Sequence, residues 1–395
     1  MKYAIVLPDG AADDPLAQLD GKTPLEAARI PNMDWVAEHG RLGRAVTIPE
    51  GFTPGTDVGT LSVLGYDPRV YYSGRAPIEA AAKGLSARPD QMIFRCNFVT
   101  VLDGLMKDNT AGHIAQAEAD ALIADLQQEL AADGCELHAG VTYRNLMLLS
   151  DSAAMQLRCA PPHDIIDQPV AAHLPQGTGA ERITKITDRA RGVIAAHDVN
   201  RRRRDAGRPP VTDIWLWGQG RPVGFESFET RFGLRGAVIT GVDILRGFAR
   251  LMGMRIIEVP GATGYVDTNY AGKGAAAVRA LDEFDLIVVH VEAADEAGHM
   301  GDPEEKVRAL ERMDEAIVGP LLRRLAESPE WRMLLAVDHP TPCTTRGHSA
   351  VPPLFAFAGS GIPAGEQAPF TEAAADRGGC WIRPGHQLIR AFLGR

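Results

Sequence analysis

The sequence has little cysteine and no long uncharged apolar run. Its 395 residues include only five cysteines, at positions 96, 135, 159, 343 and 380, and none of them forms a CxxC pair. This scatter argues against a disulfide framework and against a thiolate zinc site, and it suits a reducing compartment. No segment approaches the roughly 18 uncharged apolar residues of a membrane helix, and the first apolar run, which ends at Leu7, is too short for the core of a signal peptide. We therefore expect a cytoplasmic protein that does not span a membrane.

The sequence also lacks an excess of positive charge and the known nucleotide-binding loops. With 41 basic and 51 acidic side chains the net charge is -10, which repels a phosphate backbone and disfavours broad nucleic-acid binding. The chain has neither a GxxxxGK[ST] loop nor a kinase-type glycine loop followed by a lysine strand, so a nucleotide cofactor is not expected. An anionic ligand, such as a small phosphorylated metabolite, must therefore be met by locally placed arginines. No pattern in the sequence specifies an oligomeric state.

Length and patterning predict an α/β protein of about two domains. Helical patterns at 271–284 and 303–327 alternate with short apolar runs, which predicts a doubly wound, mostly parallel sheet. The expected buried parallel strands are short runs rich in β-branched residues, and they lie at 3–10, 213–220, 236–243, 254–262, 285–295, 331–340 and 353–359.

The stretch 91–172 has a different pattern. A strand, a helix at 115–134 and two further strands predict a small α+β arrangement there. It lies between LSARPD and the turn-rich HLPQGTGAE. We therefore expect 91–172 to be a small domain inserted into a core that is formed by 1–90 and 173–395.

Aspartate follows three of the expected strands. These residues are Asp9, Asp295 and Asp338. Because the carboxyl ends of parallel strands meet at the same edge of a sheet, we expect the three carboxylates to lie close together. Crowded carboxylates repel one another, and a divalent cation would remove that cost.

Three histidines accompany these aspartates. His299 follows Asp295 at i+4, His339 follows Asp338 directly, and His348 lies nine residues further on. Mixed carboxylate and imidazole ligands favour Mn²⁺, Zn²⁺ or Co²⁺ over Mg²⁺, and the number of ligands suggests two ions. Each aspartate taken singly could instead be a helix cap, and each histidine a satisfied core residue.

A hydroxyl nucleophile is available in the segment TPGTDVGTLSVLGYDP. After the Pro54-Gly55 turn, Thr56 stands where a helix should begin, and a hydroxyl bound to a divalent ion at that position would ionise more easily. Thr56 or Asp57 could equally be the N-cap of this helix. Ser62 is a weaker rival, because it lies inside the apolar helix.

Several motifs of the chain resemble those of a known family, the archaeal-type cofactor-independent phosphoglycerate mutases of the alkaline phosphatase superfamily. The resemblance covers nearly the whole chain and is weakest in the inserted stretch. The motifs that carry it are DG at the N-terminus, TPGTDVGTLSVLGYDP, YYSGRAPIEAAAKGL, WLWGQGRP, VPGATGYVDTNYAGK, VHVEAADEAGHMGD, and VDHPTP with His348 downstream.

The resemblance implies an alkaline-phosphatase-type core with two metal ions and an inserted lid domain. It favours Thr56 as the nucleophile, although the family usually has serine in PG-S-D or PG-S-E. It implies transfer of phosphate between the 3- and 2-hydroxyls of phosphoglycerate, without 2,3-bisphosphoglycerate, while the lid excludes water. The implied ligands of one ion are Asp9, Thr56, Asp338 and His339, and those of the other are Asp295, His299 and His348.

The resemblance also suggests residues that contact substrate. Arg144 is the candidate clamp for a carboxylate or phosphate. Lys273 matches a lysine that neutralises phosphate, or it is an exposed lysine at a helix start. His113 stands where the family commonly has arginine, in AGHI instead of AGRI, which would alter anion binding. His163 is a candidate proton shuttle, or a loop histidine bonded to its own backbone.

Three functions therefore stay open from the sequence. The first is an isomerase that converts 3-phosphoglycerate to 2-phosphoglycerate through a phosphoenzyme on Thr56. The second is a phosphomonoester hydrolase, or a phosphotransferase of the homoserine-kinase-like kind that acts on another small metabolite. The third is a metal-binding scaffold without catalysis.

Overall fold

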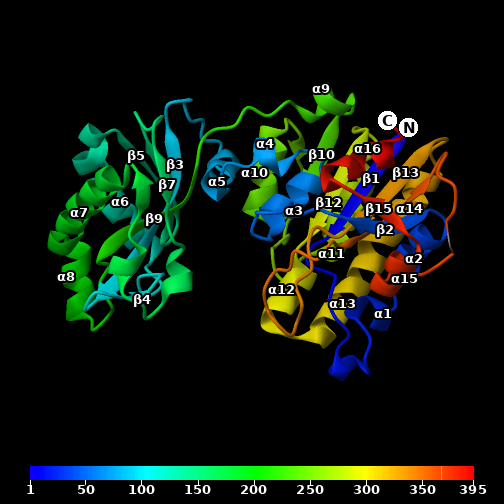
Figure 1. Ribbon diagram of the computed structural model, residues 1–395, viewed down its shortest axis with the longest axis horizontal. Coiled ribbons are helices and arrows are strands. Elements are labelled where there is room, and N and C mark those ends of the chain that lie inside the picture. The colour runs from blue at the N-terminus through cyan, green and yellow to red at the C-terminus, as the bar shows by residue number, and fades with distance from the viewer. Residues whose placement is uncertain (366) are drawn as a thin grey trace. The chain divides into compact units, whose positions relative to one another are not determined.

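The computed structural model describes residues 1–365 and 367–395 and divides into two compact units. Unit 1 comprises Met1–Tyr72 and Gly224–Arg395, and unit 2 is the inserted stretch Ser73–Val223. Each unit contains its own sheet (Figure 1). Among the described residues, no helix combines the length and the apolar character needed to cross a membrane.

The sheet of unit 1 is mostly parallel. In the described part of the chain it has eight strands in the order β11-β10-β12-β1-β13-β14-β2-β15. Their bounds are β1 (Lys2–Pro8), β2 (Arg41–Ala45), β10 (Gly236–Ile239), β11 (Arg255–Ile256), β12 (Leu286–Val291), β13 (Trp331–Ala336), β14 (Leu354–Gly359) and β15 (Cys380–Ile382). The central strand β1 pairs in parallel with β12 on one side and β13 on the other, so that Ile5 lies between Val288 and Leu334. The carboxyl ends of these three strands therefore meet at one edge.

One strand was predicted in the wrong direction. The run 353–359 forms β14, which is antiparallel to both of its neighbours, β13 and β2. A parallel neighbour of β13 would need a long crossover connection, usually a helix. The connecting residues 337–353 contain no helix, so the chain returns beside β13 in the opposite direction.

Helices cover both faces of this sheet, as expected for a doubly wound fold. Alternate residues of β1 serve the two faces: Ala4 and Val6 belong to one core, while the Tyr3 ring contacts Phe392 on the other side at 5.6 Å. The first face is covered by α2 (Pro31–Glu38), α11 (Tyr270–Ala280), α13 (Pro303–Met313), α14 (Gly319–Ala326) and α15 (Glu372–Arg377), and the second by α3 (Thr56–Val63), α10 (Asp243–Leu251) and α16 (Leu388–Leu393). The remaining α-helices described in unit 1 are α1 (Pro24–Ala27), α4 (Pro68–Tyr71), α9 (Phe228–Phe232) and α12 (Ala293–Met300).

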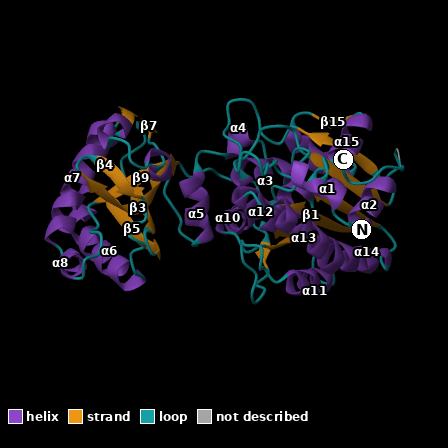
Figure 2. Cartoon of the chain, turned by 90° about the horizontal axis from the view of Figure 1, so that it is seen from below, coloured by secondary structure: helices purple, strands orange, loops and turns teal. Residues whose placement is uncertain are grey.

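Unit 2 has the α+β character expected for the insertion. Its main sheet is built around β3, which pairs with β4, β6 and β9, and Figure 2 shows α6, α7 and α8 on one side of the strands. The strands are β3 (Met92–Leu102), β4 (Leu105–Asp108), β5 (Cys135–Val141), β6 (Arg144–Leu149) and β9 (Asp213–Gly220), with a separate pair β7 (Gln156–Arg158) and β8 (Gln176–Thr178). The helices are α5 (Arg75–Ala82), α6 (Gln116–Leu130), α7 (Ala180–Ala196) and α8 (Asp198–Asp205).

The inserted unit is wider than the expected 91–172. The run 213–220 was expected in the large parallel sheet, but it forms β9 and pairs antiparallel with β3, where Phe98 lies opposite Ile214. Ile214 and Leu216 are buried in the apolar core of unit 2. Because β9 completes that core, the second boundary falls at 223 and not at 172.

Candidate active site

The three aspartates come together at the carboxyl edge of the unit 1 sheet. Asp9 directly follows β1, Asp338 lies just beyond β13, and Asp295 lies in the first turn of α12 after β12. Asp9 and Asp338 are fully buried, and the amide of Gly10 donates to Oδ1 of Asp338 at 3.4 Å. The expectation that these distant residues share one rim matches their placement in the structure.

The glycine of the DG motif is required by this crowding. Gly10 adopts a positive φ of +62°, and a Cβ on it would lie only 2.6 Å from Oδ1 of Asp295. Any other residue would therefore be strained and would also collide with an aspartate of the rim.

The first donor group contains Asp9, Asp338 and His339, whose ligand atoms all lie within 4.8 Å of one another. Nε2 of His339 lies 3.3 Å from Oδ1 of Asp9 and 3.5 Å from Oδ2 of Asp338. Its Nδ1 faces the carbonyl of Pro340 at 3.4 Å. Since a carbonyl only accepts, a ring with its proton on Nδ1 would present the Nε2 lone pair to a cation held between the two carboxylates.

Thr56 adds a hydroxyl to this group. It is the first residue of α3, and its Oγ1 lies 3.3 Å from Nε2 of His339. The N-cap of α3 is Gly55, so neither Thr56 nor Asp57 has the capping role that the sequence left open. The carboxylate of Asp57 instead accepts hydrogen bonds from the Val58 amide at 2.9 Å and from the Tyr72 hydroxyl at 2.6 Å.

Ser62 has no comparable position. Its side chain is buried within α3 and donates to the carbonyl of Thr47 at 2.5 Å. A hydroxyl that is committed to a backbone carbonyl is not available to attack a substrate, which leaves Thr56 as the better candidate of the two.

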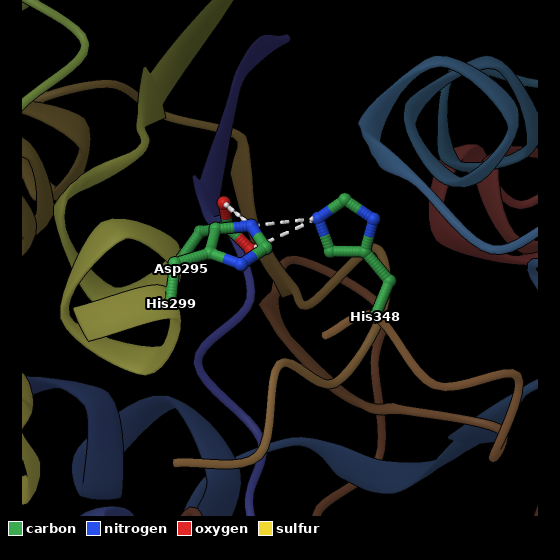
Figure 3. Close-up of side chains that lie close together, drawn as sticks. All are labelled: Asp295, His299 and His348. Atoms are coloured by element: carbon green, nitrogen blue, oxygen red, sulfur yellow. Dashed lines mark hydrogen bonds and ion pairs between the residues drawn. The ribbon is translucent and has the colours of Figure 1, made fainter. Parts of the chain in front are cut away.

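The second donor group contains Asp295, His299 and His348 (Figure 3). Nε2 of His299 lies 3.1 Å from Oδ2 of Asp295 and 3.0 Å from Nε2 of His348. The Nδ1 atoms of the two rings face backbone carbonyls, Arg346 at 2.9 Å for His299 and Pro54 at 3.3 Å for His348. Without a cation, the hydrogen bond to Asp295 raises the pKa of His299 to about 9, so Nε2 of His299 donates to that carboxylate. A bound cation would take the place of this proton and would be met by both Nε2 atoms and the carboxylate, since each Nδ1 can donate to its carbonyl.

These two groups fit divalent cations. Burial, and then the charges of Asp338 and Glu292, raise the pKa of Asp9 well above its usual value. Oδ1 of Asp9 and Oε2 of Glu292 are buried without a hydrogen-bond partner among the described residues. Burial alone would raise the pKa of Asp295, but the hydrogen bond from His299 and the charges of the histidines outweigh burial and lower it. Repelling carboxylates in the first group, and a carboxylate with two imidazoles in the second, are donor sets that a divalent cation would stabilise.

The sequence reasoning missed His290 and Glu292. Nε2 of His290 lies 2.7 Å from Oδ2 of Asp9 and 3.3 Å from Oε2 of Glu292, and its Nδ1 lies 3.2 Å from Oγ1 of Thr240. Burial raises the pKa of Glu292 to about 8. The available signal was the run LIVVHVE, where a histidine interrupts an apolar strand and an acid follows two residues later, on the same face.

Lys273 lies in the interior, which excludes the exposed lysine considered from the sequence. It is fully buried on α11, and its Nζ donates to the carbonyl of His290 at 3.1 Å. Burial lowers the pKa of Lys273 to about 8, and the charge of Glu292 opposes that shift. The structure thus shows Lys273 supporting β12, and its action on phosphate stays a prediction.

Unit 2 gathers positive side chains around Trp217. The guanidinium of Arg95 stacks over the Trp217 ring at 3.9 Å, and the His163 ring meets the same indole at 5.2 Å. Burial lowers the pKa of Arg95 to about 10, Glu79 opposes this, and the charges of Arg75 and Arg144 lower the pKa further. Arg144 and His163 therefore belong to one cluster, while Arg95 and Trp217 were missed, because one lies within a buried strand and the other within WLWGQG.

His113 lies in a different local setting. It is exposed, has a positive φ of +50°, and its amide donates to Oγ1 of Thr110 at 3.1 Å. The turn is held by Asp108, which accepts from the Thr110 and Gly112 amides. The structure thus shows a turn residue, and binding of substrate by His113 stays a prediction.

Comparisons with known proteins agree with this geometry. Residues 37–200 match the family model for 2,3-bisphosphoglycerate-independent phosphoglycerate mutase. The protein of that name from Methanothrix thermoacetophila is 48% identical over 394 residues, with 100% of both chains covered. A solved structure from Pyrococcus horikoshii has a TM-score of 0.83 at 29% identity and covers 100% of this chain and 96% of that one.

A second solved structure, the cofactor-independent phosphoglycerate mutase from Thermoplasma acidophilum, has a TM-score of 0.70 at 26% identity. It covers 100% of this chain and 99% of that chain. The similarity extends over the whole length of the chain. The chain therefore belongs to the 2,3-bisphosphoglycerate-independent phosphoglycerate mutase family and is an isomerase of that family.

Proposed function

We propose that this chain interconverts 3-phosphoglycerate and 2-phosphoglycerate through a phosphoenzyme on Thr56. One observation carries the proposal: Oγ1 of Thr56 lies 3.3 Å from Nε2 of His339, at the start of α3 and beside the carboxylates of the first donor group. A hydroxyl in this position would lose its proton more easily beside a bound divalent cation, and the resulting alkoxide could attack phosphorus. The family membership supports the same substrate class, since the relatives carry the name of this reaction.

The proposed reaction balances without a second substrate. Oγ1 of Thr56 bonds to phosphorus and loses its proton, while the bond from phosphorus to the C3 oxygen breaks and that oxygen is protonated. The C2 hydroxyl of glycerate then loses its proton and bonds to the same phosphorus, and Thr56 leaves and regains a proton. The phosphate that leaves is the one that returns, so neither 2,3-bisphosphoglycerate nor a nucleotide is required.

The two donor groups would each hold one divalent ion. When bound, Mn²⁺, or Zn²⁺, Co²⁺ or Mg²⁺ in its place, would lower the pKa of the hydroxyl and neutralise phosphate charge. The proposed ligands are Asp9, Thr56, Asp338 and His339 for one ion and Asp295, His299 and His348 for the other. His290 and Thr60 would orient this set through their contacts with Asp9 at 2.7 Å and with Asp338 at 3.4 Å.

We assign binding of the substrate's anionic groups to the cluster around Trp217. Arg95 is 8% exposed and pairs with Glu79 at 3.1 Å, while Arg75 pairs with the other oxygen of Glu79 at 3.0 Å. Glu79 thus holds two arginines side by side, and the charge of Arg144 acts on Arg95 as well. Gly218 permits this packing, because it has a φ of +58° and a Cβ there would lie 3.1 Å from Cδ of Arg95. We retain His163, whose ring contacts Trp217, as the candidate proton shuttle.

The test is phosphorus NMR of the purified protein with Mn²⁺ and 3-phosphoglycerate. We expect 2-phosphoglycerate to appear, whereas a hydrolase would release inorganic phosphate and a scaffold would produce neither. Thr56→Ala should abolish turnover and Thr56→Ser should retain it. Ser62→Ala is the matched control and should remain active, because its hydroxyl binds the Thr47 carbonyl. Full turnover of Thr56→Ala would overturn the covalent route.

A further inference from the structure

Lys306 is a fully buried lysine that none of the steps above uses. It lies on α13 and has no exposed surface. Its Nζ donates to Oδ2 of Asp13 at 2.8 Å, to the carbonyl of Thr341 at 2.9 Å and to the carbonyl of Ala12 at 3.3 Å. An ammonium has three protons, so each of them has one acceptor.

The three acceptors belong to two segments that carry proposed metal ligands. Ala12 and Asp13 follow β1 in the segment that begins with Asp9, and Thr341 follows β13 three residues after Asp338. The Thr341 amide also donates to the Ala12 carbonyl at 3.3 Å. One ammonium therefore joins the segments that supply both carboxylates of the first donor group.

The same lysine reaches the second donor group through Thr341. The hydroxyl of Thr341 donates to Asp295, and its Oγ1 lies 3.2 Å from Nδ1 of His339. The helix α12, which carries Asp295 and His299, packs on the same residue, since a Cβ on Gly298 would lie 2.3 Å from the Thr341 carbonyl oxygen. Holding that carbonyl therefore fixes a residue that contacts one ligand from each group.

The partner of Lys306 is itself fully occupied. The carboxylate of Asp13 accepts from the amides of Asp14 at 2.9 Å and of Cys343 at 3.1 Å, and its own amide donates to Glu372 at 3.1 Å. A buried ion pair of this kind is weak evidence for stability, because well-packed apolar residues of similar volume often do as well. Its contacts with two carbonyls and an amide of the ligand-bearing segments point instead to a role in geometry.

We propose that Lys306, paired with Asp13, is a positioning residue for both metal groups. It binds no ion itself. It holds the post-β1 and post-β13 segments, and through Thr341 the start of α12, at the spacing that lets the two groups form. This rests on the proposed function in one respect, namely that the groups bind divalent cations. Loss of outer contacts of this kind typically weakens metal affinity about 10- to 100-fold.

The test is titration of metal-stripped protein with Mn²⁺ alone, with free Mn²⁺ followed by electron paramagnetic resonance. We expect wild type to bind two ions and Lys306→Met to bind both about 10- to 100-fold more weakly. Lys306→Met leaves a buried carboxylate unpaired, which destabilises the fold. The double variant Lys306→Met with Asp13→Asn removes both charges and should show the same loss of affinity.

Arg203→Met is the matched control. Arg203 is a fully buried cation of unit 2 that donates to Pro209 and Ala111 carbonyls and pairs with Glu118 at 2.6 Å. It should lower the melting temperature and leave Mn²⁺ affinity unchanged. Wild-type affinity in either folded Lys306 variant, or an equal loss in Arg203→Met, would overturn the positioning role. A wild type that binds no Mn²⁺ would instead overturn the proposed function on which the role rests.

Discussion

Nε2 of His299 and Nε2 of His348 face each other across 3.0 Å, while the Nδ1 atom of each ring points at a backbone carbonyl. Two neutral rings in this arrangement direct lone pairs at one another, which is favourable only when a cation or a proton lies between them. We therefore expect His348→Ala to reduce bound Mn²⁺ from two ions per chain to one. Metal analysis after dialysis against Mn²⁺ would measure this stoichiometry.

His173→Ala is the matched control for that experiment. His173 is a half-buried histidine of unit 2 that contacts Oε1 of Gln168 at 2.9 Å and belongs to neither donor group, so its loss should leave two ions bound. Two ions retained by a folded His348→Ala protein would contradict the assignment of the second group.

Removal of metal should lower the thermal stability of the whole chain. Asp9, Asp295 and Asp338 lie together in a buried rim, and without a cation their repulsion opposes folding. An ion present at 100 times its dissociation constant adds about 2.7 kcal/mol to the free energy of unfolding for each site. Scanning fluorimetry should therefore show a lower melting temperature in EDTA and its recovery when Mn²⁺ is added in excess.

The Asp9→Asn variant offers the check on this interpretation. Since it removes one of the repelling charges, it should gain stability in EDTA relative to wild type and lose most of the stabilisation by Mn²⁺. Identical melting temperatures of wild type with and without chelator would show that the rim holds no stabilising ion.

Much of the rim could be predicted because it follows from a simple rule of parallel sheets. Asp9 and Asp338 stand at the ends of buried apolar runs, and parallel strands bring such ends to one edge whatever their separation in the chain. Thr56 was predicted for a related reason, since a Pro-Gly turn before an apolar helix marks where that helix begins. Local signals were sufficient for these residues.

The other parts of the fold and of the site depend on strand pairings that no local sequence signal encodes. Residues 213–220 have the apolar character of a strand in either sheet, and only the pairing with β3 assigns them to unit 2. Arg95 alternates with core residues in β3 and resembles an ordinary strand residue until Trp217, more than a hundred positions away, is placed over it. The roles of His290 and Lys306 likewise exist only once β1, β12 and β13 are side by side.

Arg95 should govern the binding of substrate more than the chemical step. We expect Arg95→Met to lower kcat/KM for 3-phosphoglycerate about 10- to 100-fold, mostly through KM, because a hydrogen bond to a charged group contributes about 1.5 to 3 kcal/mol. Arg95→Lys should recover part of the loss, since it keeps the charge and loses the planar fork. Steady-state kinetics with saturating Mn²⁺ would separate the two constants.

An arginine elsewhere on unit 2 controls for the loss of charge. Arg88 is exposed and pairs with Asp90 at 3.2 Å, so Arg88→Met should leave KM unchanged. An unaltered KM in Arg95→Met would remove Arg95 from the substrate site.

Lys273 should make the stability of the metal-free protein depend on pH above 8. Burial lowers its pKa in the fold to about 8, against an ordinary value of 10.5. Between these values the unfolded chain holds a proton that the native amine has lost, so raising the pH stabilises the fold, by up to about 1.4 kcal/mol per pH unit. Below pH 8 the amine is charged in both states, and the cost of burying that charge is fully present. The raised pKa of Glu292, about 8, acts below this window and in the opposite direction.

The measurement is the difference in unfolding free energy between wild type and Lys273→Met, followed in EDTA from pH 8 to pH 10. Titration of groups remote from Lys273 is common to both proteins and cancels, so above the pKa of Glu292 the difference should shift in favour of wild type as the pH rises. Lys185→Met, which removes an exposed lysine of α7, should show no such slope. If the difference in unfolding free energy did not change with pH, the amine of Lys273 would have the same pKa in the folded and unfolded chain. The group that contacts the His290 carbonyl would then be an ammonium with an ordinary pKa.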